Sequence, residues 1–260
     1  KYLLTGKERL LFFLHICTKL ITIFATQSKY TYMANQRTPT ELGTERIGKL
    51  LMQYAIPAII AMTASSLYNM VDSIFIGHGV GTMAISGLAI TFPLMNLAAA
   101  FGSLVGVGAA TLVSVRLGQK DYDTAQRVLG NVVVLNVIIG VMFTILCLLF
   151  LDPILRFFGA SDATLPYARD YMQVILLGNV VTHLYLGLNS VLSSSGHPQK
   201  AMFATIATVL INTALDPLFI FVFGWGIQGA AIATIIAQII SLVWLIYLFG
   251  DKRELLHFHK

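Results

Sequence analysis

Charged side chains are scarce in this sequence of 260 residues, since Asp, Glu, Lys and Arg make up 11% of it and apolar residues 57%. The mean hydropathy of +0.78 lies far outside the range of ordinary soluble domains. Only two cysteines are present, and both Cys17 and Cys147 lie in apolar runs without the spacing of a metal site. The scarcity of charge therefore excludes a soluble domain and predicts an integral membrane protein.

The sequence also lacks the short motifs of common enzymes. It has no HExxH zinc motif, no glycine-rich phosphate loop followed by Lys and no GxSxG nucleophile turn. We therefore expect no enzyme, no cofactor and no ATP-driven engine, so energy for any transport must come from an ion gradient or a further partner. The net charge of +5 does not indicate nucleic-acid binding, because the basic residues are scattered between apolar segments.

Six apolar segments reach or approach the roughly 20 residues that a helix needs to cross the hydrocarbon of a bilayer. The second is too long for a straight perpendicular span, so we expect it to tilt, to kink at Pro93 or to protrude into water. The sequence predicts an all-α membrane protein with a bundle of six helices over residues 51–250. The segments are 51–77, 84–115, 128–151, 171–193, 201–224 and 227–250.

Basic residues between these segments indicate the topology. If the N-terminal side is cytoplasmic, ten Lys and Arg residues fall in the inner connections, whereas only Arg156 and Arg169 fall in the outer ones. We therefore expect a multi-pass protein of the cytoplasmic (inner) membrane with both ends of the chain in the cytoplasm. In the inner connection GQKDYDTAQRVL, Asp123 and Gln126 have the spacing of a capping box for the third helix.

The two ends of the sequence differ from the bundle. Residues 1–32 contain an apolar run that is interrupted by Lys19 and lacks a clear cleavage pattern. We expect residues 1–32 to lie outside the native fold, with a short surface helix as the alternative. Residues 33–50 are polar and predict a cytoplasmic N-terminal segment, and residues 251–260 are a basic segment after the last helix.

Asp216 is a carboxylate in the fifth apolar segment, which is otherwise free of charge. A charged Asp in hydrocarbon costs at least about 2.5 to 3.5 kcal/mol, so such a residue normally faces protein or water and marks a path for ions. Asn212 lies one turn earlier on the same helical face. Pro217 removes a backbone donor and predicts a bend beside the acid.

Asp72, near the outer end of the first segment, is the other carboxylate in comparable surroundings. Asn69 lies three residues before it and shares its side of the helix. Both acids fall in the predicted outer half, where a cavity would let them bind the same proton or cation. The alternatives are an interfacial position for Asp72, a structural role for Asp216, and ordinary interhelical hydrogen bonding for the two amides.

The fourth segment carries Asn179, His183 and Asn189. His183 has no neighbouring carboxylate in sequence, so packing explains it better than proton transfer. The second segment carries a face of small residues that permits close helix approach and indicates packing rather than a specific function. The small residues are Gly102, Gly106 and Gly108.

Four passages in order along the chain resemble the multidrug and toxic compound extrusion (MATE) family of secondary transporters. The similarity covers about Glu45 to Phe249. The resemblance implies a twelve-helix fold of two six-helix lobes, of which this chain would be the N-terminal lobe. The passages are QYAIPAIIAMTASSLYNMVDSIFIGHGVG, FGSLVGVGAATLVSVRLGQKDYDTAQ, LNSVLSSSGHPQKAM and INTALDPLFIFVFGWGIQGAAIAT.

The same resemblance implies export of bulky, often cationic organic compounds in exchange for H+ or Na+. It adds Thr234 to a cation site with Asp72, Asn212 and Asp216, and it implies a hinge at Pro57. It also implies that Asn189 faces the substrate cavity, where we expect Asn179 and Asn69 to give polar support. No metal other than Na+ at the two acids is expected.

This chain has the length of one lobe. We therefore expect a fragment that lacks its C-terminal six-helix partner, with residues 251–260 beginning the connection between lobes; a half-protein that must pair is the alternative. The alternative function is a flippase or exporter of lipid-linked sugars from the same superfamily, which would show a cationic cavity.

Overall fold

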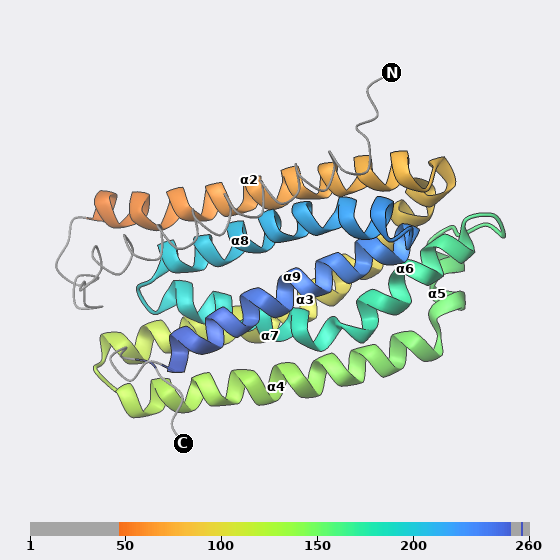
Figure 1. Ribbon diagram of the computed structural model, residues 1–260. Coiled ribbons are helices and arrows are strands. Elements are labelled where there is room, and N and C mark those ends of the chain that lie inside the picture. The colour runs from red at the N-terminus through yellow and green to blue at the C-terminus, as the bar shows by residue number, and fades with distance from the viewer. Residues whose placement is uncertain (1–46, 251–255, 257–260) are drawn as a thin grey trace.

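The structure is a computed structural model that describes residues 47–250 and residue 256 (Figure 1). The predictions for residues 1–32, for most of 33–50 and for most of 251–260 fall outside the described residues. Helices account for every regular element within the described part. These are α2 (Ile47–Gly79), α3 (Thr82–Gly118), α4 (Tyr122–Leu149), α5 (Leu151–Phe157), α6 (Leu165–Leu177), α7 (Asn179–Ser194), α8 (Pro198–Pro217), the π-helix η2 (Leu218–Val222) and α9 (Gly226–Gly250).

The long helices lie side by side in one bundle (Figure 1). Five are long and apolar enough to cross a membrane, namely α2, α3, α4, α8 together with η2, and α9. The pair α6 and α7 passes the same test as one broken span, bent by 56° around Gly178. The described chain thus carries up to six spans, which confirms the prediction of an all-α, six-helix, multi-pass membrane protein.

The second span, α3, contains 37 residues and continues through Pro93 without a break. At about 1.5 Å per residue it is roughly 55 Å long, well beyond the roughly 30 Å of a hydrocarbon core. The helix is unbroken at Pro93. Its length agrees with the expected tilt or protrusion into water, and the choice among tilt, kink and protrusion stays a prediction.

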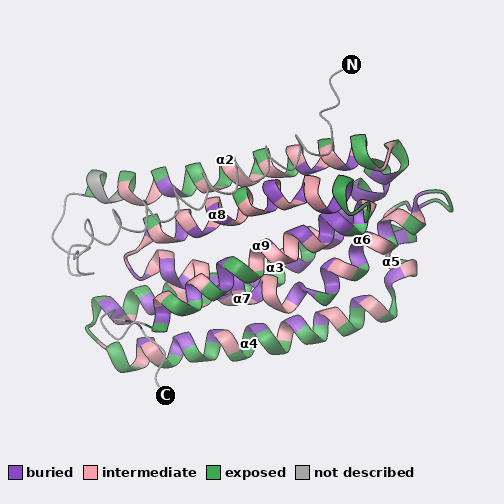
Figure 2. Ribbon diagram, in the orientation of Figure 1, coloured by how far each residue is buried: buried purple, intermediate pink, exposed green. Residues whose placement is uncertain are grey.

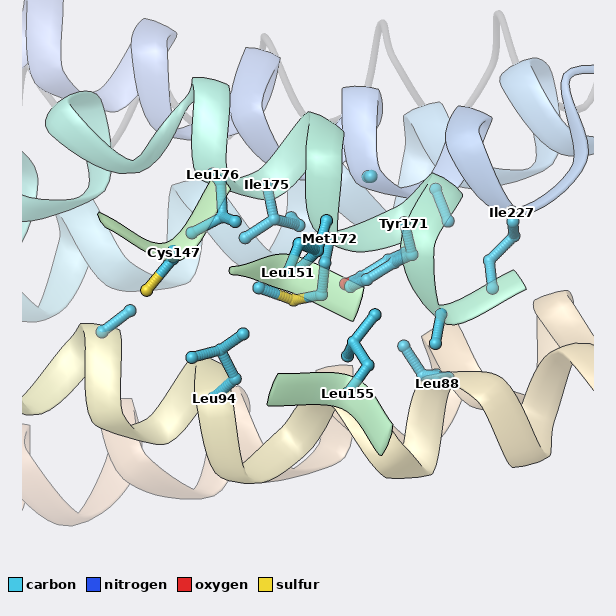
Figure 3. Close-up of a cluster of buried hydrophobic side chains, with 14 of the residues drawn as sticks. Leu88, Leu94, Cys147, Leu151, Leu155, Tyr171, Met172, Ile175, Leu176 and Ile227 are labelled. Carbon is cyan, nitrogen blue, oxygen red and sulfur yellow. The ribbon is translucent and has the colours of Figure 1, made fainter. Parts of the chain in front are cut away.

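The core consists of two apolar clusters, one toward each end of the bundle. The first, shown in Figure 3, joins the start of α3 and the end of α4 to α5, α6 and η2, and contains Leu88, Leu155 and Tyr171. The second joins the end of α3 and the start of α4 to α7, α8 and the end of α9. Buried polar side chains lie between the two clusters along these helices: Asn136, His183, Asn212, Asp216 and Ser241.

Helix α2 lies at the edge of the bundle and packs chiefly against α8 (Figures 1 and 2). Only 11% of its apolar membrane window is buried, against 33% for α8 and for α9. Large apolar side chains such as Ile59, Met62 and Met70 remain exposed. Helix α2 is therefore the least buried of the five unbroken spans, and the interface between α2 and α8 carries most of its attachment.

The start of α4 differs from the prediction. The helix begins at Tyr122, so its N-cap is Asp121 rather than Asp123, and the Asp121 carboxylate accepts a hydrogen bond from the Thr124 amide at 3.2 Å. Hydrogen bonds from the Thr124 hydroxyl and amide lower the pKa of Asp121. Asp and Asn both favour the N-cap, and the sequence offered two acids two residues apart. Asp121, the first of them, is the N-cap because α4 begins before its apolar run does.

Candidate functional site

The two acids singled out in the sequence meet where α2 packs against α8. Asp72 of α2 is 4% exposed and Asp216 of α8 is fully buried. Their carboxyl groups are close enough to interact electrostatically. Two acids on neighbouring helices, 144 positions apart in the chain, thus share one buried site, as the sequence predicted. Neither lies in an exposed, interfacial position.

Thr234 of α9 is the centre of the hydrogen bonds around this pair. Its hydroxyl donates to the Ala230 carbonyl at 3.1 Å and accepts from the Asn212 side-chain amide at 3.1 Å. The Tyr68 hydroxyl lies 3.0 Å from the same oxygen. Either hydroxyl can donate in the bond between Tyr68 and Thr234. Thr234 therefore ties α2 and α8 to α9.

Several buried oxygen atoms of the site have no hydrogen-bond donor within the described residues. They are one oxygen of Asp72, both oxygens of Asp216 and the side-chain oxygen of Asn212. Buried polar atoms without a partner are rare, because desolvation of such a group costs about 1 to 3 kcal/mol. A proton or a small cation would satisfy these acceptors. The site is thus a candidate for binding a proton or a small cation.

Two tyrosines complete the site, and sequence reasoning did not select them. Tyr68 is half-buried and lies one turn before Asp72, on the same face of α2. Tyr171 of α6 is buried and interacts with Thr234, Tyr68 and both acids; Figure 3 shows its ring inside the first apolar cluster. The spacing of four residues was a usable signal for Tyr68. Nothing local marked Tyr171, since it comes from the broken span across the bundle.

The two predicted hinge prolines behave differently. At Pro217 the α-helix ends and continues as the π-helix η2, next to Asp216. Proline has no amide hydrogen, so the regular hydrogen-bond ladder is interrupted there, and π-turns occur often at functional sites. Helix α2 instead continues through Pro57 as one uninterrupted helix (Figure 1). The predicted irregularity at Pro217 is observed as a switch from α-helix to π-helix. A bend there and a hinge at Pro57 stay predictions.

The three remaining asparagines do not share one location. Asn69 is exposed and outside the buried site, since three residues rotate a helix by about 300° and carry it past the inward face. The Asn179 amide is buried at the contact of α7 with α4, 3.4 Å from the Thr144 hydroxyl. Asn189 lines a cleft. Only Asn189 therefore has the predicted place beside a cavity; Asn69 and Asn179 do not.

This cleft, of about 610 Å³, opens between α2, α3, α7 and α8, toward the end of the bundle where α2 begins. None of its lining residues is charged. Tyr54, Met62 and Pro57 line it from α2, while hydroxyl and amide groups come chiefly from α3, α7 and α8: Thr111, Ser114, Asn189, Ser190, Ser193, Ser194 and Thr205. Such a mixture of apolar and neutral polar groups suits an organic molecule.

His183 belongs to a second buried polar cluster, between α3, α4 and α7. Its ring lies toward the backbone of Ala98, yet neither nitrogen has a well-formed hydrogen bond. A Cβ on Gly102 or Gly140 would come within 2.9 Å or 3.4 Å of the ring. Glycines on two helices therefore make room for His183, which agrees with the packing role that the sequence indicated. No group of three His, Cys, Asp or Glu side chains that could hold a metal ion occurs among the described residues.

Comparison with known proteins identifies relatives of this chain. The multidrug export protein MepA of Staphylococcus haemolyticus is 32% identical over 213 residues, which are 82% of this chain and 47% of that protein. MepA of Staphylococcus aureus is 30% identical over 79% of this chain and 46% of its own length. The chain thus spans about half the length of the curated relatives it matches.

This chain also superposes on about half of the length of solved transporter structures. A MATE structure in the bent conformation superposes with a TM-score of 0.80 at 27% identity, over 86% of this chain and 50% of the other. A Pyrococcus furiosus transporter of the MOP superfamily, described as having a binding pocket of reverse polarity, gives a TM-score of 0.76 at 28% identity, over 80% and 46%.

These relatives and neighbours are named as export proteins and transporters, which confirms the prediction that the chain is not an enzyme. The MatE family model matches residues 57–218, well over half of the chain. As the four sequence passages predicted, the chain belongs to the MATE family.

Proposed function

We propose that these residues form one lobe of a secondary transporter that exports bulky, often cationic organic compounds in exchange for H+ or Na+. The observation that carries the proposal is the buried Asp72–Asp216 pair, whose free oxygens face no donor within the described residues. The names of the relatives, multidrug export proteins, support the direction of transport and the class of substrate. The other lobe of the transporter would be the principal partner.

The net charge at the interface between α2 and α8 depends on whether the acid pair has bound a proton or Na+. With both acids ionised and close together, repulsion acts between α2 and α8 in surroundings of low polarity. Uptake of a proton or Na+ removes this repulsion and draws the carboxyl groups together. Because α2 has few contacts other than those with α8, ion uptake changes the packing of α2 more than that of the other helices. Transport then follows alternating access, in which ion binding favours the state that releases the substrate and substrate favours the opposite state.

The cleft would receive the organic compound. It holds no charged side chain, so the attraction for a cationic compound comes from the neighbouring acids, from the Tyr54 ring or from the other lobe. The excess of basic residues in the predicted inner connections supports a cytoplasmic position for both ends of the chain and for the cleft mouth. A lipid-linked sugar exporter is disfavoured, because no Lys or Arg lines the cleft.

The test is ethidium efflux from cells that express the full product of the gene, with H+ and Na+ gradients imposed separately. Asp216→Asn keeps the size of the side chain but cannot ionise, so it should abolish gradient-driven efflux while membrane insertion and expression stay normal. The gradient that drives efflux by the unmodified protein identifies the coupling ion. Undiminished efflux by Asp216→Asn would overturn the proposal.

A further inference from the structure

Helix α2 presents one stripe of side chains to the cleft. Its lining residues recur at the spacing of a single helical face: Tyr54, Pro57, Ala58, Ala61 and Met62. Tyr54 lies at the end of this stripe nearest the start of α2, and it is half-buried. It is also the only aromatic side chain among the described residues that line the cleft. The described walls therefore offer a bound molecule one aromatic ring.

The ring of Tyr54 is free to contact a bound molecule. Other aromatic side chains of the bundle lie against one another, as in the stack of Phe219 on Trp225, whose ring centroids are 5.2 Å apart. No ring contact of this kind ties Tyr54 to another aromatic side chain of the described helices. Its ring face is therefore not used up by packing on a second ring.

Hydroxyl groups around the cleft are arranged as hydrogen-bond acceptors. Four of them donate their one proton to a backbone carbonyl, so oxygen lone pairs are what they offer to a ligand. These bonds run from Thr111 to Val107 at 3.1 Å, from Ser114 to Ser194 at 3.2 Å, from Ser190 to Leu186 at 2.9 Å and from Ser194 to Val191 at 2.9 Å. The side-chain oxygen of Asn189 is a further acceptor, and it has no donor within the described residues. Such a lining suits a ligand with N–H groups.

The acid pair lies too far away to hold a cation in the cleft. Thr205 lines the cleft eleven residues before Asp216, which is about 16 Å of helix rise. Met62 lies ten residues before Asp72, or about 15 Å. Both distances exceed the screening length of about 8 Å at physiological ionic strength. The attraction for a cation in the cleft therefore comes from the cleft itself, through the Tyr54 ring and the acceptor oxygens.

We propose that Tyr54 gives the cleft a preference for flat aromatic cations that carry N–H groups. The inference rests on the proposed export function and names the part of the substrate that this lobe recognises. The electron-rich face of the ring stacks on the cation, and this attraction is strongest where water is displaced. The Asn189 and Ser190 oxygens accept hydrogen bonds from N–H groups at the edge of the compound.

The rest of the cleft fits the same class of compound. Its volume of about 610 Å³ lies within the range of pockets that hold drug-sized ligands. Met62 and Met202 line it from α2 and α8. Methionine side chains are flexible and polarizable, so they adapt to ring systems of different shape. Tyr54 therefore supplies the selection for charge, whereas the methionines tolerate variation in the rings.

The experiment compares the binding of a charged compound with that of its uncharged counterpart. Ethidium is an aromatic cation with two amino groups, and dihydroethidium is its reduced form, which keeps the amino groups and carries no charge. Each is titrated by fluorescence into the full product of the gene in lipid nanodiscs. Tyr54→Leu should raise the half-saturating concentration of ethidium by about 5-fold or more, and that of dihydroethidium much less. Retained binding of dihydroethidium also shows that the variant is folded.

Three further variants make the result specific. Tyr54→Phe keeps the ring face and should bind both compounds normally. Asn189→Leu removes an acceptor and should weaken both compounds alike, because both carry amino groups. Tyr122→Leu makes the same change as Tyr54→Leu at an exposed tyrosine of α4 outside the cleft, and it should bind both compounds normally.

Several outcomes would overturn the assignment. They are unchanged binding of ethidium in Tyr54→Leu, an equal loss of the two compounds in that variant, or a loss in Tyr54→Phe. Unchanged binding of both compounds in Asn189→Leu would overturn the role of the acceptor oxygens. Efflux by Asp216→Asn tests the proposed function separately. Undiminished efflux there, together with a loss of ethidium alone in Tyr54→Leu, would remove the ion coupling and keep the assignment of the cleft; the reverse pattern would do the opposite.

Discussion

The bundle buries two polar clusters that are built in opposite ways. The carboxyl cluster joins α2, α8, α9 and α6, and is made of Tyr68, Asp72, Tyr171, Asn212, Asp216 and Thr234. The glycine cluster joins α3, α4 and α7, and is made of Gly102, Gly106, Asn136, Gly140, His183 and Gly187. Both hold polar atoms without partners among the described residues. Only the first contains acids.

In the glycine cluster the helices approach until their backbones meet. A Cβ on Gly106 of α3 would lie 2.8 Å from the Cα of Gly187, and a Cβ on Gly187 would lie 2.2 Å from the Asn136 amide nitrogen of α4. Close packing of small residues is the usual means by which membrane helices hold together. In the carboxyl cluster, the peripheral α2 is joined instead by the hydrogen bond between Tyr68 and Thr234, beside two acids that repel each other when ionised. One cluster is therefore held by close packing, whereas the other depends on hydrogen bonding and on the charge state of its acids.

The largest effect is expected on transport, when the charges of the carboxyl cluster are removed. The double variant Asp72→Asn with Asp216→Asn removes all charge from the carboxyl cluster, so gradient-driven efflux should fall to background. Thermal stability in detergent at neutral pH should be equal or higher, since two neighbouring buried acids are replaced by amides that carry no charge at any pH. Asp123→Asn, an exposed acid of α4, is the matched control and should leave both properties unchanged. A marked loss of stability in the double variant would show that the acids hold the fold rather than couple ions.

In the glycine cluster, by contrast, a substitution should lower stability. Gly106→Ala places a methyl group against the α7 backbone, which cannot rotate away, so it should lower the free energy of unfolding by about 1 to 3 kcal/mol. Denaturant titration in mixed micelles measures this change. Gly108→Ala, two residues along α3 with nothing within 4 Å of the added carbon, should instead be neutral or stabilising by up to about 1 kcal/mol.

The ion dependence of efflux is a second measurement on the Gly106→Ala variant. Gly106→Ala should leave the driving ion unchanged in whatever fraction of the protein folds, because no atom of the carboxyl cluster is touched. A change of coupling ion without a loss of stability would mean that the two clusters are not separate.

The sequence predicted the carboxyl cluster better than the glycine cluster, for physical reasons. A lone acid in an apolar segment is conspicuous because its burial is costly, so Asp72 and Asp216 were found from the residues alone. Amides and tyrosines are common enough in membrane helices that Asn69 was wrongly included and Tyr171 was missed. Their roles depend on helix rotation and on the path of a broken span, which a linear pattern does not contain.

A smaller effect on coupling is expected at Thr234, the residue that ties α2 and α8 to α9. Thr234→Val removes the acceptor of Asn212 and Tyr68 and leaves two buried groups unpaired, at a cost of about 1 to 3 kcal/mol. Because Asp72 and Asp216 remain, efflux should persist but require a steeper gradient. Thr234→Ser restores the hydroxyl and should recover normal efflux. Full activity of the valine variant would remove Thr234 from the site and leave the acids alone responsible for coupling.

The smallest effect is expected at Tyr171, the member of the carboxyl cluster that comes from α6. Tyr171→Phe deletes one oxygen and keeps the ring, which packs within the first apolar cluster, so the fold should be unaffected. A single neutral hydrogen bond contributes about 1 kcal/mol, which corresponds to a change of about fivefold in the ion concentration that half-saturates efflux. Tyr247→Phe, at an exposed position of α9, is the matched control. A shift in Tyr171→Phe alone would place α6, and with it the bent span, among the elements that sense the bound ion; equal behaviour of the two variants would confine ion sensing to α2, α8 and α9.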